Sequence, residues 1–418
     1  MPDRSPITIA INAWTGSAPA KPSSLSSTQY AKSRFSTAPQ YAAAMPPEVS
    51  ESAWQHEKIG WGLVLPENEA LAPNVKARAE DAPDAIQRLL QHRAGGVHKP
   101  YPPVFRYSAT WQHRFSRIHR YLEDGRVVEV AFAGSAPGIG EACMPRYLLL
   151  YGTPQELPWD LQFHLQGSAF VGRIDLDGDG LANYIEALIN GFGDASVDRP
   201  VVWSADHENG DITELMRRAI AEPIFRRLKA NVTLAPTHLS RRTATVGKLL
   251  DALASAKPAL VITTSHGLTS PLDDSAALAA SVGVPVDSDA AALSVDALMS
   301  AWSPNGAIWY AHACCSGGTD KTTGFAGLVA EDSDVDLVLR AIASSGSRVA
   351  PLPRALLGAP KPLRAFVGHV EPTFDWTLRS NATGQILRTR SSMRCTRNCT
   401  ASNRWRVPLR STIALPRA

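Results

Sequence analysis

Two apolar runs, residues 258–267 and 306–318, constrain the fold of this chain more than any other feature. Each contains β-branched or aromatic residues and ends in the small residues of a turn. Continuous apolar runs of this length are typical of strands that are buried on both faces of a parallel sheet. The first run ends at His266 and Gly267, and the second leads into Cys314. Because ligands and chemistry gather at the carboxyl ends of such strands, we expect the imidazole and the thiol to share one site.

Strand-like and helix-like segments alternate from residue 146 onward. Apolar runs that indicate strands also lie at residues 147–152, 169–174, 200–205 and 363–369. Helical periodicity is found at residues 181–189, 211–228, 245–254, 293–302 and 335–343, and Pro223 is expected to kink or split the second of these. The alternation predicts an α/β fold with a parallel-rich sheet and helices on both faces. We assign this domain to residues 140–378.

The two ends of the chain have a different composition. Residues 1–139 predict a loose arm rich in Ser, Ala and Pro, followed by a small β-rich or irregular subdomain. Within it, residues 100–125 interleave aromatic and basic side chains, a mixture that can stack on single-stranded nucleic acid. The alternative, which we favour, is a β-rich subdomain packed on the main sheet. Residues 379–418 are rich in arginine and lack acidic residues, and we interpret them as a disordered basic tail.

Charge and cysteine content narrow the class of protein. The net charge is only +3, which offers no case for a nucleic-acid partner. Five cysteines, an odd number in a long chain, argue against a disulfide framework and favour a reduced, cytoplasmic protein. The amino terminus shows no signal-peptide pattern, and no apolar run is long enough to span a bilayer. We therefore expect no membrane partner, and the oligomeric state is not predicted.

A cysteine and a histidine at one sheet edge suit nucleophilic catalysis. Cysteine attacks a carbonyl as the thiolate, so it needs a lowered pKa or a nearby base. Histidine titrates near neutrality and can pass the proton to a leaving amine. Glycine after the histidine would allow a substrate to approach the backbone closely.

These motifs resemble those of the caspase-like (clan CD) cysteine peptidases. The shared features are Ser-His-Gly after an apolar strand and Ala-Cys-Xaa-Ser-Gly about fifty residues later. The likeness is greatest to CHAT (caspase-associated) domains and more distant to gingipains, and three further stretches fit the group, at residues 171–173, 271–274 and 367–370. The resemblance covers residues 140–378. It implies a caspase-like fold and endopeptidase activity on a peptide or protein substrate, with no required cofactor.

The resemblance also implies roles for individual residues. His266 would be the catalytic histidine and Cys314 the nucleophile, with the backbone N–H groups of Gly267 and Cys314 as oxyanion donors. Cys315 stands where the family shows a variable residue and is the alternative nucleophile. Cys314 is preferred, because adjacent strand residues face opposite sides. The family's substrate-binding residues are not readable here, although an acidic residue could accept a basic substrate side chain, the candidates being Asp273, Asp274 and Asp320.

Less specific interpretations stay open beside the catalytic one. A Ser-His-Gly sequence can be a strand end with a hydrogen-bonded histidine, and buried cysteines are common in cores. The same fold would then be a catalytically weak or inactive CHAT-like module for partner recognition. His312 lies two residues before Cys314 and would share its face of a strand. It could be a polar group of the site, a metal ligand or, as we favour, a packed core histidine.

Residues 175–186 match the calcium-loop pattern at every position. The oxygen ligands would come from Asp175, Asp177, Asp179, the Leu181 carbonyl, Asn183 and Glu186. A predicted strand, rather than a helix, precedes the pattern. Aspartates at a strand-to-helix turn also favour a helix N-terminus without any metal. Calcium is therefore a candidate cofactor, with a plain strand-to-helix turn as the alternative.

Overall fold

The computed structural model describes residues 7–25, 49–95, 102–325, 327–380 and 383–386. These residues divide between two compact units. Unit 1 contains residues 7–25 and 191–386, and unit 2 contains residues 49–190. The boundary predicted near residue 140 therefore lies near residue 190. The predicted basic tail falls outside the described residues except for its first few positions.

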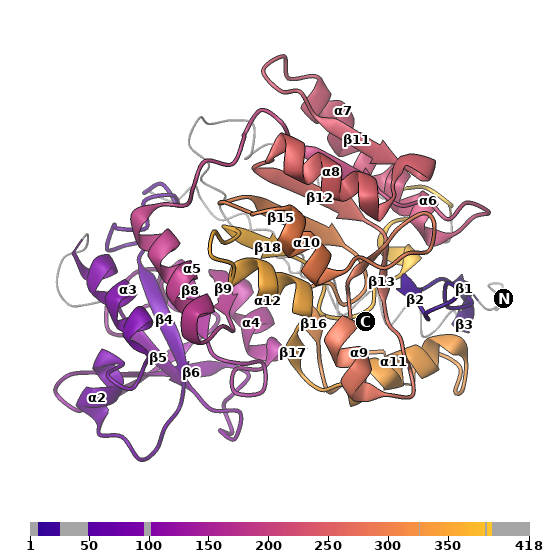
Figure 1. Ribbon diagram of the computed structural model, residues 1–418. Helices are drawn as coiled ribbons and strands as arrows, with labels where there is room; N and C mark the ends of the chain where they lie inside the picture. Colours follow the sequence, from indigo (N-terminus) through magenta and orange to yellow (C-terminus); the bar gives the residue numbers. More distant parts are fainter. Residues whose placement is uncertain (1–6, 26–48, 96–101, 326, 381–382, 387–418) are drawn as a thin grey trace. The chain divides into compact units, whose positions relative to one another are not determined.

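Unit 1 is built on a five-stranded sheet in which every pair of neighbours is parallel. Its spatial order is β11-β10-β12-β15-β18. The bounds are β10 Val201–Ser204, β11 Thr237–Ser240, β12 Leu260–Thr264, β15 Ile308–His312 and β18 Ala365–Val367 (Figure 1). All five residues of β12 are buried, as its continuous apolar sequence predicts. The predicted α/β class with a parallel-rich sheet is confirmed.

Helices of unit 1 pack on this sheet through apolar side chains. Leu249 of α8, Leu298 of α10 and Leu352 of α12 share one buried cluster with Trp309 of β15. The helical segment from Asp211, which Pro223 is predicted to kink or split, is divided into α6, a π-helical turn and α7, and Pro223 stands at the start of α7. The bounds are α6 Ile212–Met216, π-turn Arg217–Ala221, α7 Glu222–Lys229, α8 Val246–Ala256, α9 Ser275–Ser281, α10 Val295–Ala301, α11 Asp334–Ser344 and α12 Pro351–Leu357.

The amino-terminal strands belong to unit 1, which corrects their assignment to a separate amino-terminal region. Ile9, Ile11 and Leu25 are buried in the same cluster as Cys314. The strands are β1 Ile7–Ile9, β2 Ala13–Trp14 and β3 Ser23–Leu25, and β2 pairs with β13 (His266–Leu268), which also pairs with β14 (Pro285–Val286). The short strands β16 (Gly318–Thr319) and β17 (Arg348–Val349) form a separate pair. Of the predicted loose arm, residues 26–48 lie outside the described residues.

Unit 2 contains a six-stranded mixed sheet in the order β7-β6-β5-β4-β8-β9. Strands β5, β4, β8 and β9 are parallel, and β6 and β7 are antiparallel. The bounds are β4 Trp61–Pro66, β5 Val104–Tyr107, β6 Arg117–Tyr121, β7 Val127–Ala131, β8 Tyr147–Tyr151 and β9 Phe170–Ile174, with helices α2 Pro73–Arg78, α3 Asp84–Ala94, α4 Trp159–Gln166 and α5 Gly178–Asn190. The aromatic and basic segment is thus part of a sheet, and the strands predicted at residues 147–152 and 169–174 extend this sheet rather than that of unit 1.

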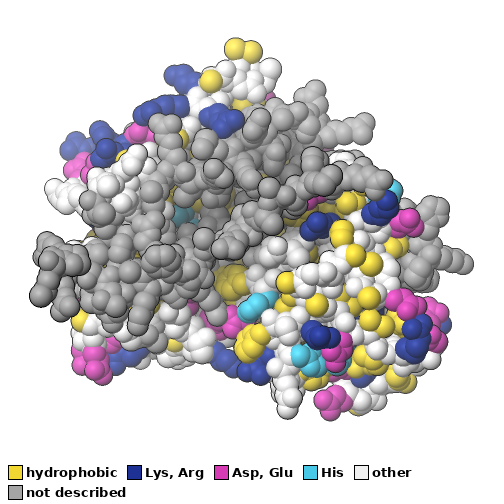
Figure 2. All heavy atoms as spheres, turned by 180° about the vertical axis from the view of Figure 1, so that it is seen from behind, with side chains coloured by type: hydrophobic (Ala, Val, Ile, Leu, Met, Phe, Trp, Pro, Cys, Tyr) yellow, Lys and Arg dark blue, Asp and Glu magenta, His cyan; other side chains and the backbone are white. Residues whose placement is uncertain are grey.

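Surface charge and helix length both bear on the partners that this chain could have. On the face drawn in Figure 2, Lys and Arg side chains lie among Asp and Glu side chains. This mixing agrees with the near-balanced charge of the sequence. Among the described residues, none of the helices has both the length and the apolar character needed to cross a bilayer.

Candidate active site

The chain segments after β12 and β15 run side by side at the carboxyl edge of the sheet. Thr264 is the register partner of His312, and the Ser265 N–H donates to the His312 carbonyl at 3.3 Å. One step further, the backbone of Gly267 lies against Cys314. A Cβ added to Gly267 would lie 2.0 Å from the Cys314 carbonyl oxygen and 2.9 Å from its nitrogen. The two strand ends named by the sequence are therefore in direct backbone contact.

Gly267→Ala is expected to destabilise the protein by about 1–3 kcal/mol or more, the usual cost of overpacking a filled site. The added methyl group would collide with backbone atoms of Cys314, which cannot rotate away. Chemical denaturation of the variant would measure the loss. Gly247→Ala is the matched control, because a Cβ at this position in α8 has nothing within 4 Å. Equal stability of the two variants would contradict the close approach.

Cys314 is held in the interior of unit 1. Its side chain is fully buried in a cluster with Ile9, Ile11 and Phe374. Its sulfur accepts a hydrogen bond from the Thr373 backbone N–H at 3.4 Å. Burial raises the pKa of the thiol to about 12, although this hydrogen bond opposes the rise. In this arrangement the thiol is neutral at pH 7, and within the described residues it makes no hydrogen bond with the His266 ring.

The neighbouring Cys315 is also fully buried, and burial raises the pKa of its thiol well above the ordinary value. Its φ angle is 52°, in the left-handed region that non-glycine residues seldom adopt. The tight turn that follows is held by the Ser316 hydroxyl, which donates to the Ala313 carbonyl at 2.9 Å. Backbone strain of this kind clusters at functional sites. Such strain at the residue after Cys314 is an observation that sequence alone did not provide.

The His266 imidazole is oriented by a carboxylate. Its Nε2 lies 3.0 Å and 3.1 Å from the two side-chain oxygens of Asp211. Asp211 also caps α6 by accepting from the Thr213 N–H at 2.8 Å. Although burial opposes it, hydrogen bonding from His266 and Thr213 lowers the pKa of Asp211 to about 2. The Asp211 carboxylate is therefore ionised, and it accepts a hydrogen bond from the N–H at Nε2 of His266. Sequence analysis identified Asp211 as a helix start but missed this contact.

Two further aromatic side chains complete the surroundings of His266. The Trp14 ring stacks on the His207 ring, with centroids 4.9 Å apart and planes at 26°. The centroids of His207 and His266 lie 5.1 Å apart. Burial lowers the pKa of His207, and the neighbouring His266 adds to this effect. Sequence analysis missed both residues.

A signal for part of this cluster was present in the sequence. His207 and Asp211 follow β10, as His266 follows β12. When the five strands of the unit 1 sheet are numbered in chain order, their spatial order is 2-1-3-4-5, so the direction of winding reverses between β10 and β12. Such a switch point is the usual ligand site in open α/β sheets. Trp14 carried no comparable signal, because its strand reaches the site only through pairing with β13.

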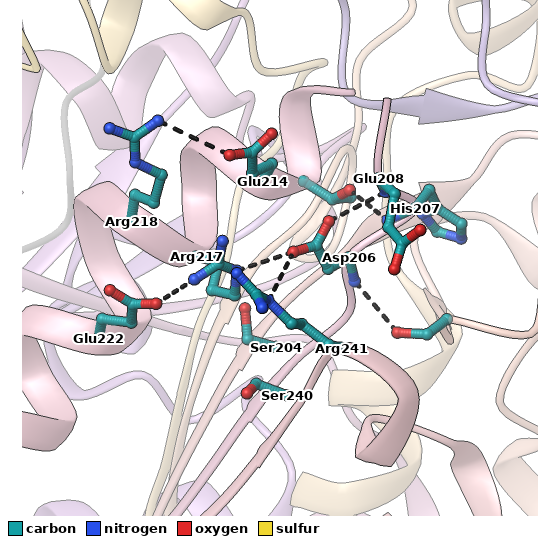
Figure 3. A network of polar contacts seen from close by, with 12 residues as sticks. Ser204, Asp206, His207, Glu208, Glu214, Arg217, Arg218, Glu222, Ser240 and Arg241 are labelled. Carbon is teal, nitrogen blue, oxygen red and sulfur yellow. Dashed lines mark hydrogen bonds and ion pairs between the residues drawn. The ribbon is translucent and has the colours of Figure 1, made fainter. Parts of the chain in front are cut away.

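A buried ion-pair network fixes the segment that carries His207 and Asp211. Figure 3 shows the Asp206 carboxylate paired with the guanidinium groups of both Arg217 and Arg241. The Nε atom of Arg217 donates to the Asp206 carboxylate at 2.8 Å, and Arg217 also pairs with Glu222. The Asp206 carboxylate in turn accepts from the Glu208 N–H at 3.0 Å. These bonds hold the loop after β10 in one conformation.

His312 is a packed core histidine, as favoured from the sequence. It is buried, and its Nδ1 lies 3.0 Å from His369 Nε2 and 3.1 Å from the Tyr310 hydroxyl. Burial lowers the pKa of His369 to about 4. Burial, with His369 nearby, also brings the pKa of His312 well below its ordinary value. Both rings are therefore neutral at pH 7.

These two histidines should make folding sensitive to acid. The unfolded chain binds protons on histidine near pH 6.5, whereas folded His369 does so near pH 4. Between these two pH values the folded state binds fewer protons than the unfolded chain. The free energy of unfolding should therefore fall as the pH drops from 6.5 to 4, by about 3 kcal/mol for His369. Urea denaturation between pH 7 and pH 4 measures the slope. His369→Gln should flatten it, whereas the exposed His92→Gln should not. Equal slopes in all three proteins would contradict the prediction.

The calcium-loop pattern forms a strand-to-helix turn in the structure. Helix α5 begins at Gly178, so Asp179, Leu181, Asn183 and Glu186 are all helical. The loop geometry of a calcium site requires non-helical backbone through most of these positions. Glu186 instead lies 3.2 Å from Arg88. Within the described residues the predicted carboxylates do not gather around a common point. The structure therefore follows the alternative interpretation, and we do not propose calcium.

The acidic candidates for substrate recognition have other contacts. The Asp274 carboxylate caps α9 by accepting from two backbone N–H groups at 3.0 Å. Asp320 is buried and accepts from the Ser347 hydroxyl at 2.6 Å. The Val-Gly-Arg stretch at residues 171–173 lies in β9 of unit 2. The stretch at residues 367–370 begins at the end of β18 in unit 1, so only part of the predicted resemblance falls in the unit that carries His266.

No family model, curated protein or solved structure matches this chain. Its function is therefore argued from the geometry of the site and the chemistry of its residues.

Proposed function

We propose that this chain is a cysteine endopeptidase of caspase-like type, with Cys314 as nucleophile and His266 as general acid and base. The observation that supports this most strongly is the backbone contact between Gly267 and Cys314 at the carboxyl edge of a parallel sheet. In the proposed reaction, His266 takes the proton of the Cys314 thiol, the resulting thiolate attacks the peptide carbonyl, and His266 returns the proton to the leaving amine as the C–N bond breaks. Water then hydrolyses the thioester, with His266 accepting its proton.

Asp211 sets the tautomer that this role requires. The ionised carboxylate accepts a hydrogen bond from Nε2, so the neutral ring carries its proton on that nitrogen. Nδ1 then has a free lone pair, and within the described residues it has no hydrogen-bond partner. A base with its lone pair available and its other nitrogen anchored is the arrangement found in catalytic triads. Asp211 is thus a positioning residue in the proposed mechanism.

The proposal requires a resting state and an active state. Cys314 is buried with a neutral thiol, so its sulfur is not a thiolate nucleophile in this arrangement. Attack on a substrate needs the sulfur to leave the apolar cluster that includes Ile9 and Ile11 and to approach His266. Catalytic hydrogen bonds commonly tighten only when a substrate is bound.

Peptide-library cleavage by the wild type and three cysteine variants tests the proposal. Cys314→Ala should abolish cleavage, because the nucleophile is lost. Cys143→Ala, in unit 2, is the matched control and should retain it. Cys315→Ala decides between the adjacent thiols and should also retain cleavage. Full activity in Cys314→Ala would contradict the assignment, provided that circular dichroism shows every variant to be folded.

A catalytically inactive recognition module is the alternative, and the burial of Cys314 favours it. Iodoacetamide labelling followed by peptide mapping distinguishes the two functions. In a peptidase, Cys314 should react faster than Cys143 at neutral pH in the presence of a cleavable peptide, and His266→Ala should remove the difference. Slower labelling of Cys314 in both proteins would favour the module.

A further inference from the structure

We propose that His207, Asp211 and His266 form a binding site for a divalent transition-metal ion such as Zn²⁺. A metal ion bound there would prevent His266 from acting as the general acid and base. The binding site is argued from geometry alone, whereas the inhibitory consequence rests on the proposed peptidase function.

The three side chains already converge on one point. One ligand atom from each lies within 4.8 Å of the others. His266 Nε2 is 3.0 Å and 3.1 Å from the two oxygens of Asp211. Zinc bonds to histidine nitrogen and carboxylate oxygen are about 2.0–2.2 Å long, which sets neighbouring ligand atoms roughly 3 Å apart. An ion could therefore replace the proton shared by His266 and Asp211 with little movement of either residue.

Unsatisfied nitrogens at this point give an independent reason. Neither ring nitrogen of His207 makes a well-formed hydrogen bond, and both are buried. The Asp287 backbone also interacts with this ring and opposes part of the fall in the pKa of His207. Buried polar atoms in native proteins nearly always have a partner, and a bound ion is one explanation for an atom that has none. A metal ion would satisfy one nitrogen of His207, and the Asp287 backbone would become the outer contact that orients a ligating histidine.

The donor set selects the class of metal. Two imidazoles and one carboxylate suit Zn²⁺ and its neighbours in the transition series, whereas Ca²⁺ and Mg²⁺ prefer oxygen ligands. Three protein ligands leave a coordination position for water or substrate. The Trp14 ring, stacked on His207, brings an indole beside the site. Its fluorescence is therefore a direct reporter of metal binding.

A second histidine cluster must be removed before the site is tested. His113, His119 and Glu129 of unit 2 also hold ligand atoms within 4.8 Å of one another. Their case is weaker, because the two histidines already satisfy each other through nitrogens 2.9 Å apart. Trp111 stacks on His119 at 3.8 Å and would also respond to bound metal. The full chain carrying His113→Ala and His119→Ala is therefore the parent protein for the experiment.

Cobalt titration of this parent protein tests the inference. Co²⁺ should bind with one equivalent, develop visible absorption bands and be displaced by Zn²⁺. Adding His207→Ala should weaken binding at least tenfold, whereas adding His238→Ala, in β11 of the same unit, should not. Equal affinity in the His207→Ala protein would overturn the proposal. X-ray absorption of the zinc-loaded parent gives a check that needs no variant: nitrogen and oxygen ligands support the site, and sulfur ligands overturn it.

This design tests the metal-site proposal and the peptidase proposal separately, because each can be contradicted without the other. If the parent binds Co²⁺ through His207 but cleaves no peptide, the metal site stands and the peptidase proposal fails. If it cleaves peptides, Zn²⁺ should inhibit it, and His207→Ala should raise the half-inhibiting concentration at least tenfold. Cleavage without any metal binding would leave the peptidase proposal intact and overturn this inference.

Discussion

Asp211→Asn is expected to lower kcat by about 10²–10⁴-fold, the range associated with a misplaced general base. The asparagine amide would donate to Nε2 of His266, so the ring proton would move to Nδ1. Nδ1 could then no longer accept the proton of the Cys314 thiol. KM should change little, because Asp211 contacts the imidazole rather than the substrate in the proposed mechanism. Steady-state kinetics on the best peptide from the library would separate the two constants.

Asp274→Asn is the matched control for this substitution. Asp274 and Asp211 are both helix N-caps with side-chain oxygens bonded to backbone N–H groups. Asparagine caps helices about as well as aspartate, so both variants should remain folded. Only Asp211 contacts a histidine in this way, and only its replacement should reduce kcat. A wild-type kcat in Asp211→Asn would refute the positioning role.

Arg217→Ala should lower the free energy of unfolding by about 3–5 kcal/mol, the usual cost of breaking a buried ion pair from one side. The side chains of Arg217 and Asp206 are only 6% and 3% exposed. Removing the guanidinium leaves the Asp206 carboxylate buried without its strongest partner, and it also removes a contact of Glu222. Denaturant titration monitored by circular dichroism measures the loss.

The adjacent Arg218→Ala provides the comparison. Arg218 is 56% exposed and lies 3.6 Å from Glu214 on the same helical segment. Exposed pairs of this kind contribute little, and the change should stay within about 0.5 kcal/mol. Because Arg217 braces the loop that carries His207 and Asp211, its variant should also bind Co²⁺ more weakly. Equal stability of the two arginine variants would contradict the buried network of Figure 3.

Several features of unit 1 were predictable from local sequence. The runs that form β12 and β15 are mostly apolar, with polar residues only at their carboxyl ends, and such runs are typical of strands buried in parallel sheets. Glycine follows His266, and small residues follow Cys314, so the chain turns where each strand ends. Since the ends of parallel strands meet at one edge, the approach of these two segments followed from sequence order and strand type.

The division of the chain was not predictable in the same way. Strands β8 and β9 have an apolar character like that of β12, yet β8 pairs with β4 and β9 pairs with β8, both in unit 2. Strand pairing joins residues far apart in sequence, and a single strand does not specify which sheet it extends. The calcium-loop pattern was ambiguous for a related reason. Its ligand positions also suit an amphipathic helix, and packing of Leu181 and Ile185 in the interior selects α5.

By itself, the sequence determined an α/β fold in which one buried strand leads to a histidine and another leads to a cysteine. Only the tertiary structure decided what surrounds those groups. It brings Trp14 of β2 beside His266, joins the imidazole to Asp211, and buries the Cys314 sulfur among apolar side chains. Hydrogen-bond partners and burial depend on contacts between distant segments, and these contacts set the pKa values of the carboxylate and the thiol. Residue types therefore name the chemistry available to this site, and packing decides the protonation state in which it rests.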